Sequence, residues 1–127
     1  MIGPLRAERT RLVRFGVSGL CSTAIHTLVA AALFALLDAT PVTANAVAFG
    51  CATAFSYLAN TLWSFSSTVR TRNAMRFLAV TLAGFVETIL IARAAEVLDV
   101  SRAMGVVAIA LLIPPTTFVL HRLWTYR

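Results

Sequence analysis

Two stretches of the chain, NTLWSF at residues 60–65 and HRLWTY at residues 121–126, carry one pattern twice, 61 positions apart. Each ends an apolar run with a Leu-Trp pair, followed by a hydroxyl residue and an aromatic residue. Upstream, the dipeptide Arg-Phe at residues 14–15 returns at residues 76–77 with an offset of 62. Agreement at both ends of both halves predicts two copies of one helical hairpin, related as parallel repeats.

The composition is that of a membrane protein. Of the 127 residues, 59% are hydrophobic and 13% are charged, and the mean hydropathy is +0.84. A soluble domain of this length cannot bury so much apolar surface in one core. The net charge of +6 does not indicate nucleic-acid binding, because the arginines lie between apolar runs and form no continuous basic face. We therefore expect an all-α membrane protein with no nucleic-acid partner.

Four apolar runs are long enough to cross the hydrocarbon layer, which takes about 20 helical residues. They are Val13–Leu37, Val42–Phe65, Met75–Leu98 and Ala103–Tyr126. The first run is too long for the apolar region of a signal peptide, so we expect no cleavage. The short connections predict antiparallel neighbours within a single transmembrane domain over residues 1–127. Its repeats are expected at about 13–66 and about 75–126.

The arginines predict the orientation of the spans. They gather on one side, before the first span, in the middle connection and at the end of the chain: Arg6, Arg9, Arg11, Arg14, Arg70, Arg72, Arg76, Arg122 and Arg127. The other side has Asp38 in one connection, and Asp99 with Arg102 in the other. Because arginine is concentrated in short cytoplasmic loops, both termini are expected to be cytoplasmic.

The chain resembles the GtrA-like family of small four-span membrane proteins. The likeness lies in RFGVSGLCSTAIHTLVAAALFALL followed by NTLWSF, and in RFLAVTLAGFVETIL followed by HRLWTYR. It extends from Val13 to Arg127. The family pattern is an opening Arg-Phe with a glycine, then a closing Asn-Arg-x-Trp-x-Phe-like run, so the resemblance rests on several elements together.

This resemblance implies translocation of a polyprenyl-phosphate-linked monosaccharide across the bacterial cytoplasmic membrane, for O-antigen, teichoic acid or other envelope polymers. It also implies a membrane glycosyltransferase as partner. Some members of the family have been argued to act as anchors or recruiters instead. Four helices form a narrow groove, so we expect a homo-oligomer or a complex with the transferase. No motif of an enzyme site is present, and no metal or other cofactor is expected.

The closing runs depart from the family pattern. The basic residue expected after Asn60 is replaced by Thr61. The second run keeps Arg122 but has His121 in the place of Asn60. A phosphate clamp built from the closing runs would therefore be lopsided, with Arg122 on one side only.

Two polar residues are expected near the middle of the membrane. Glu87 lies eleven residues after Arg76, which is about 16 Å along a helix. His26 lies twelve residues after Arg14, at a similar depth. An intramembrane acid is a candidate for headgroup binding or proton coupling, or for a structural bond between helices. His26 could share a proton with Glu87 across the repeat interface, or simply bond a neighbour.

The inner interface holds the other candidate binding residues. Guanidinium groups of Arg14, Arg76 and Arg122 suit a phosphate, although topology and attraction to anionic lipid explain them equally well. Asn60 and His121 offer donors at the same depth for a sugar hydroxyl or a phosphate. Trp63 and Trp124 are candidates for the site and also fit an aromatic interface belt.

Three further features carry local expectations. Arg93 and Glu96 are spaced to form an ion pair near the outer interface, where Arg93 could instead receive a phosphate. The pair Pro114-Pro115 is expected to interrupt the fourth span, as a tolerated kink or as part of a site. A small-residue face at positions 16, 18, 19 and 22 predicts close helix contact.

Two alternatives to translocation stay open on the sequence. The chain could be a scaffold that recruits a polyprenyl-phosphate glycosyltransferase and transports nothing. It could also be a small proton-coupled drug exporter, which the single acid expected near mid-membrane favours. The orientation bias and the duplicated hairpins count against the exporter.

Overall fold

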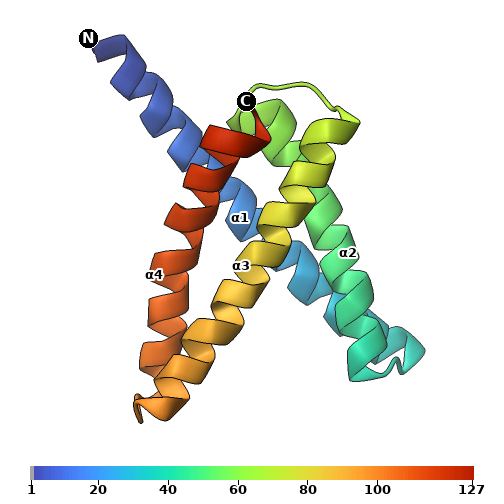
Figure 1. Ribbon diagram of the computed structural model, residues 1–127. Helices are drawn as coiled ribbons and strands as arrows, with labels where there is room; N and C mark the ends of the chain where they lie inside the picture. Colours follow the sequence, from blue (N-terminus) through green and yellow to red (C-terminus); the bar gives the residue numbers. More distant parts are fainter. Residues whose placement is uncertain (1) are drawn as a thin grey trace. The chain divides into compact units, whose positions relative to one another are not determined.

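The computed structural model describes residues 2–127, without the side chains of Pro41 and Arg102, and this part of the chain is helical with no strand (Figure 1). In chain order the elements are α1 (Ile2–Leu37), α2 (Pro41–Ala59), η1 (Asn60–Ser64), α3 (Thr71–Val97), α4 (Arg102–Leu120) and η2 (His121–Thr125), where η1 and η2 are π-helices. Four segments are long and apolar enough to span a membrane. The predicted all-α architecture with four spans is therefore confirmed.

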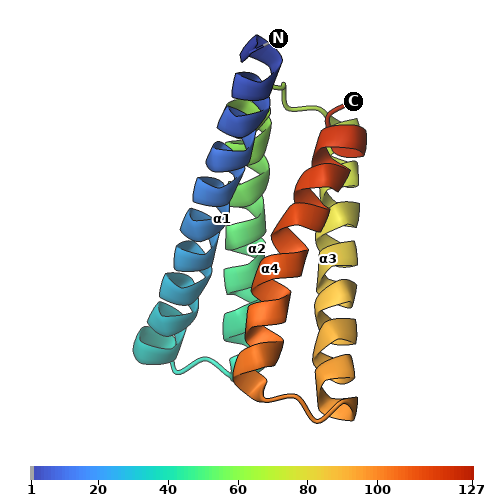
Figure 2. The same ribbon diagram turned by 90° about the vertical axis from the view of Figure 1, so that its left-hand side faces the viewer.

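The helices form two compact units, one ending at Val69 and the other beginning at Arg70. In the first unit α1 packs along α2 and against η1, and in the second unit α3 packs along α4 and against η2. Each unit is an antiparallel hairpin in both views of the ribbon (Figures 1 and 2). The boundaries of the sequence repeats and the cytoplasmic location of the termini stay predictions.

Helix α1 is longer than the span predicted to begin at Val13. It starts at Ile2 and has 36 residues, which gives a length of about 54 Å against about 30 Å of hydrocarbon. Charged residues end an apolar run without ending a helix, because arginine and glutamate are good helix formers. An ion pair between Arg11 Nη1 and Glu8 Oε1, at 2.6 Å, joins adjacent turns of this extension. The extra turns continue past the end of η1 (Figure 2).

The turn inside each hairpin repeats a second pattern, which the sequence analysis missed. Asp38 follows α1 with φ of 49°, and Asp99 follows α3 with φ of 54°. Aspartate tolerates this left-handed conformation better than most residues. Two positions on, the hydroxyls of Thr40 and Ser101 cap α2 and α4 by accepting a backbone N–H at 3.3 and 3.2 Å. The signal was present as Leu-Asp-x-Thr and Leu-Asp-x-Ser, 61 residues apart.

Helix α4 runs without a break through Pro114 and Pro115, so a broken helix is wrong here, and the tolerated kink stays a prediction. The hydroxyls of Thr116 and Thr117 donate to the carbonyls four residues earlier, both at 2.9 Å. Ending the helix here would expose further backbone groups to an apolar environment. A continuous helix leaves unpaired only the two carbonyls that would bond the N–H groups of these positions, because proline has no N–H.

The small-residue face of α1 makes close contact through its serines only. Ser18 Oγ lies 3.2 Å from Ser64 Oγ, and Ser22 Oγ donates to the Ala52 carbonyl at 3.0 Å. Positions 16 and 19 have open space where a Cβ would stand, so these two glycines do not serve helix contact.

The closest glycine contact lies instead in the second unit. A Cβ built on Gly84 would stand 3.2 Å from Thr117 Cγ2 and 3.8 Å from Ile113 Cγ2. Gly84 thus allows α3 to approach α4, and no spacing motif in the sequence pointed to it.

Gly84→Leu is expected to lower the free energy of unfolding by about 1–3 kcal/mol, because the larger side chain separates α3 from α4. Gly50→Leu is the matched control, since a Cβ at Gly50 meets nothing within 4 Å. Thermal unfolding of the purified proteins in one detergent measures the difference. Equal midpoints for the two variants would refute the close contact.

Candidate functional site

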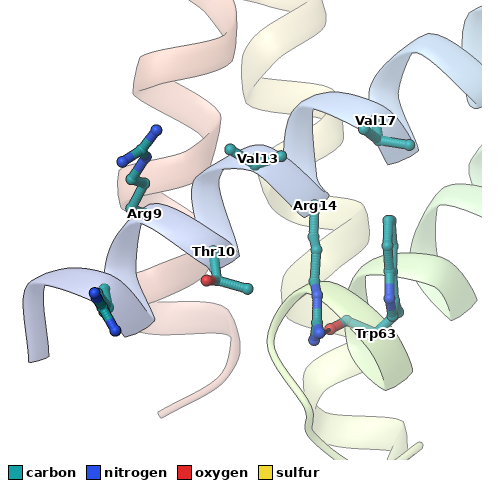
Figure 3. A pocket seen from close by; sticks show the side chains of 7 residues that line it. Arg9, Thr10, Val13, Arg14, Val17 and Trp63 are labelled. Carbon is teal, nitrogen blue, oxygen red and sulfur yellow. Dashed lines mark hydrogen bonds between the residues drawn. The ribbon is translucent and has the colours of Figure 1, made fainter. Parts of the chain in front are cut away.

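An arginine–tryptophan corner joins the two ends of the first unit. Arg14 Nη1, on α1, donates to the backbone carbonyl of Trp63 at 3.0 Å. The Arg14 Cζ atom lies 5.4 Å from the centroid of the Trp63 ring, within the range of a cation–π contact. Figure 3 shows the two side chains lying side by side. One guanidinium therefore holds both the backbone and the ring of the tryptophan.

The second unit contains the same corner, from residues 62 and 61 positions later. Arg76 Nη1, on α3, donates to the carbonyl of Trp124 at 2.8 Å, and its Cζ atom lies 5.2 Å from the ring centroid. The sequence predicted these four residues at the inner interface as separate candidates. The structure brings them together as two pairs with nearly equal geometry.

The π-helices explain why an arginine is needed at each corner. Phe65 N donates to Asn60 O at 2.9 Å, and Tyr126 N donates to His121 O at 3.1 Å, so each hairpin ends in a wide turn. The last carbonyls of any helix lack intrahelical donors. The Trp63 and Trp124 carbonyls lie in these last turns, and each receives its donor from the neighbouring helix. Single-turn π-helices are also frequent at functional sites.

The π-helix of the first unit buries a polar group that lacks a full set of partners. The Asn60 side chain, only 1% exposed, donates from Nδ2 to Ser56 Oγ at 3.1 Å. Its Oδ1 atom has no partner. Rotating the amide group by 180° would exchange Oδ1 and Nδ2, so Oδ1 would then face Ser56 and Nδ2 would be left without a partner. Asn60 is thus placed inside the hairpin and not at its surface.

The second unit fills the same position with an aromatic stack. The His121 ring lies 4.5 Å from the ring of Phe77, nearly parallel at 14°. His121 Nδ1 also lies 2.9 Å from Thr125 Oγ1, and His121 is only 3% exposed. His121 therefore packs the interior of this hairpin and is not available to a surface ligand.

A pocket of about 590 Å³ opens beside the Arg14–Trp63 corner. Arg6, Arg9 and Thr10 line one end of it, and Val13 and Val17 line the other (Figure 3). These residues follow the helical spacing along a single face of α1. The pocket therefore has Arg6 and Arg9 toward the start of α1, and Arg14 between the two valines toward the membrane span. The sequence analysis used Arg6 and Arg9 for orientation only, although this spacing was readable.

The two residues predicted near mid-membrane each have a partner within their own unit. His26 Nε2 lies 3.2 Å from Asn45 Oδ1, which joins α1 to α2. Thr116 Oγ1 lies 3.3 Å from Glu87 Oε1, which joins α4 to α3, and shares its single hydroxyl hydrogen between this carboxyl oxygen and the Leu112 carbonyl at 2.9 Å. Both His26 and Glu87 are half-buried. Asn45 and Thr116 were not among the predicted residues, because their partners depend on how the helices align.

The remaining candidates lie apart from the corners. Arg93 is exposed near the end of α3, and among the described side chains no ion pair links it to Glu96, so that predicted pair is not formed. Glu96 lines a smaller pocket of about 270 Å³ at the α3–α4 turn. Arg122 is exposed in η2.

The sequence profile of the GtrA/DPMS transmembrane domain matches residues 14–126. The chain belongs to this family. The match runs from Arg14 to Tyr126 and so includes both arginine–tryptophan corners. The family assignment made from the sequence is confirmed, and with four spanning helices the chain is a multi-pass membrane protein. No curated protein and no solved structure matches it.

Arg76→Gln is expected to lower the free energy of unfolding by about 1–2 kcal/mol, because the Trp124 carbonyl loses a charged donor. Arg72→Gln is the control, since Arg72 is an exposed residue in the first turn of the same helix. Thermal unfolding in detergent compares the two. A control that loses as much stability as Arg76→Gln would show that charge, and not the bond to the carbonyl, is responsible.

Proposed function

We propose that this GtrA-family protein translocates a polyprenyl-phosphate-linked monosaccharide across the bacterial cytoplasmic membrane. The observation that carries the proposal is the pocket at the Arg14–Trp63 corner, which combines three arginines with the apolar side chains of Val13 and Val17. Such a pocket suits a lipid whose phosphate lies near the interface while its chain stays in the bilayer.

The arginine at the corner keeps donors for a ligand. A guanidinium has five N–H groups, and Arg14 gives one hydrogen bond to Trp63. The same holds for Arg76 in the second unit. Planar donors of this kind bind phosphate oxygens in pairs, which fixes the direction of the headgroup as well as its position.

Glu87 and His26, predicted near the middle of the membrane, supply the hydrogen-bonding groups that a sugar needs while it crosses. Glu87 and His26 already bond a hydroxyl and an amide across their hairpins. A sugar hydroxyl can replace either partner, so the headgroup crosses the apolar layer without losing every hydrogen bond. The polyprenyl chain remains in the lipid throughout, and only the headgroup needs this route.

The proposal places the protein beside a membrane glycosyltransferase that loads the sugar on the inner leaflet. Both termini would be cytoplasmic, so the two corners would face the loading side. No covalent bond is made or broken during translocation, so the role is transport and not catalysis. A second copy of the chain, or the transferase, would widen the groove that four helices leave.

Glu87→Gln is expected to slow translocation by about tenfold, the effect of losing one hydrogen bond to a charged group. Proteoliposomes are loaded with a short-chain polyprenyl-phosphate hexose, and the rate at which inner-leaflet sugar reaches an external reagent is measured. Glu96→Gln, on the same helix near the α3–α4 turn, is the matched control and is expected to keep the wild-type rate.

A protein that gives no exchange above empty vesicles, across several sugars and with the transferase present, would refute translocation. If the same protein restored sugar transfer by the glycosyltransferase, the result would favour the recruiting scaffold. Proton-coupled efflux of a drug from the vesicles would favour the exporter.

A further inference from the structure

The cationic pocket belongs to the first unit alone, although the corner beside it is repeated. Arg6, Arg9 and Arg14 line it together. With the offset of 62 that relates Arg14 to Arg76, the counterparts of the other two are Thr68 and Thr71. Helix α3 also begins only at Thr71, so the second unit has no matching helical extension. The two halves therefore share a corner but place their other arginines differently around it, since the second unit has Arg70 and Arg72 instead.

Among the described residues, no acid lines the pocket beside the three guanidinium groups. The lining contains no aspartate or glutamate, and the nearest acid along α1, Glu8, is bonded to Arg11 at 2.6 Å. Thr10 adds a hydroxyl between the arginines. The lining of the pocket thus carries three positive charges and many N–H donors.

We propose that this pocket binds the phosphomonoester headgroup of a lipid in preference to the phosphodiester of a lipid-linked sugar. The inference rests on the proposed function and names a second ligand for the same site. A phosphodiester carries one negative charge, whereas a phosphomonoester carries about 1.5–2 at neutral pH, with three oxygens that accept strong hydrogen bonds. Three arginines in the lining of one pocket match the second ligand better.

The apolar end of the pocket selects a lipid over free phosphate. Going along α1, the lining changes from Arg6 and Arg9 to Val13, Arg14 and Val17, with the Trp63 ring beside them. This order places the headgroup toward the start of the helix and the first carbons of a chain toward the membrane span (Figure 3). A soluble phosphate would contact the arginines of the pocket but not the apolar side chains that line it.

A lipid phosphomonoester is what remains when a glycosyl group leaves its carrier. In that transfer an acceptor hydroxyl forms the new bond to the anomeric carbon, and the old bond from that carbon to the phosphate oxygen breaks. The phosphate keeps the electron pair, and the hydroxyl proton goes to a base or to solvent. The pocket then holds the spent carrier on the predicted cytoplasmic side, after the carrier has returned from the outer leaflet where the sugar leaves it, so that it can be loaded again.

Binding is tested through Trp63 fluorescence in the Trp124→Phe protein, which has no other tryptophan. This background keeps the bond from Arg76, because that bond is to the backbone. The probes are farnesyl phosphate, farnesyl phosphoglucose, dioctanoyl phosphatidylglycerol and inorganic phosphate. Farnesyl phosphate is expected to bind about tenfold tighter than each of the others, the effect of one further charge-assisted bond.

The preference is expected to fall to about twofold or less in the double variant Arg6→Gln, Arg9→Gln, because one charge then remains beside Arg14. Arg11→Gln is the matched control, since Arg11 lies in the same stretch but is bonded to Glu8 outside the pocket lining.

Lowering the pH from 7.5 to 5 is also expected to remove the preference for farnesyl phosphate. The second ionisation of a phosphomonoester lies near pH 6, whereas the lining arginines keep their charge over this range.

Equal affinity for farnesyl phosphate and farnesyl phosphoglucose would overturn the inference, as would equal weakening by Arg11→Gln. Phosphatidylglycerol or inorganic phosphate binding as tightly as farnesyl phosphate would overturn it too, by making the pocket a general anion site. The preference found in a protein that does not exchange sugar lipid in vesicles would contradict the proposed function and leave this binding site standing. Exchange of sugar lipid in vesicles by a protein without the preference for farnesyl phosphate would support the proposed function and overturn this binding site.

Discussion

The structure depends on the satisfaction of backbone carbonyls where each hairpin returns to the interface. In an apolar environment an unpaired carbonyl costs several kcal/mol, so a helix that ends there needs a donor from outside. Arg14 and Arg76 supply that donor to Trp63 and Trp124. The same guanidinium groups lie over the tryptophan rings, which fixes where each ring sits. One interaction therefore closes the hairpin and also places a cation next to an aromatic ring at the membrane surface.

The two hairpins agree at their arginine–tryptophan corners and differ in the packing behind them. The corners agree to within a few tenths of an ångström, because the need for a carbonyl donor is the same in each. The interiors behind them have diverged, with Asn60 in one hairpin and His121 stacked on Phe77 in the other. A duplicated hairpin can vary wherever its packing has more than one solution. The positions of the other arginines vary as well, and in the first unit Arg6 and Arg9 line the pocket beside the corner.

The spans, the repeated dipeptides and the family were readable from the sequence, because hydrophobic length and recurrence are properties of the chain alone. The partners of the polar residues were not. Arginines at an interface suggested topology, and only the backbone path shows that Arg14 and Arg76 cap carbonyls. The same limit explains two errors. Pro114 was expected to interrupt its helix, but in lipid a continuous helix leaves fewer unpaired groups than a broken one. The glycine that serves helix contact is Gly84, which depends on what lies opposite it.

Under the proposed translocation, the bonds of Glu87 and His26, which are predicted near the middle of the membrane, bear on how a polar headgroup can pass. Left without partners, Glu87 and His26 would each cost free energy, and a ligand that paired with them would be held tightly. The structure gives them Thr116 and Asn45 as partners in the neighbouring helix. A sugar hydroxyl that displaces the Thr116 hydroxyl exchanges one hydrogen bond for another of the same kind. The gain on binding is then small, and so is the cost of release. A translocation path must release the headgroup again, so it benefits from polar residues whose hydrogen bonds are already made before the headgroup arrives.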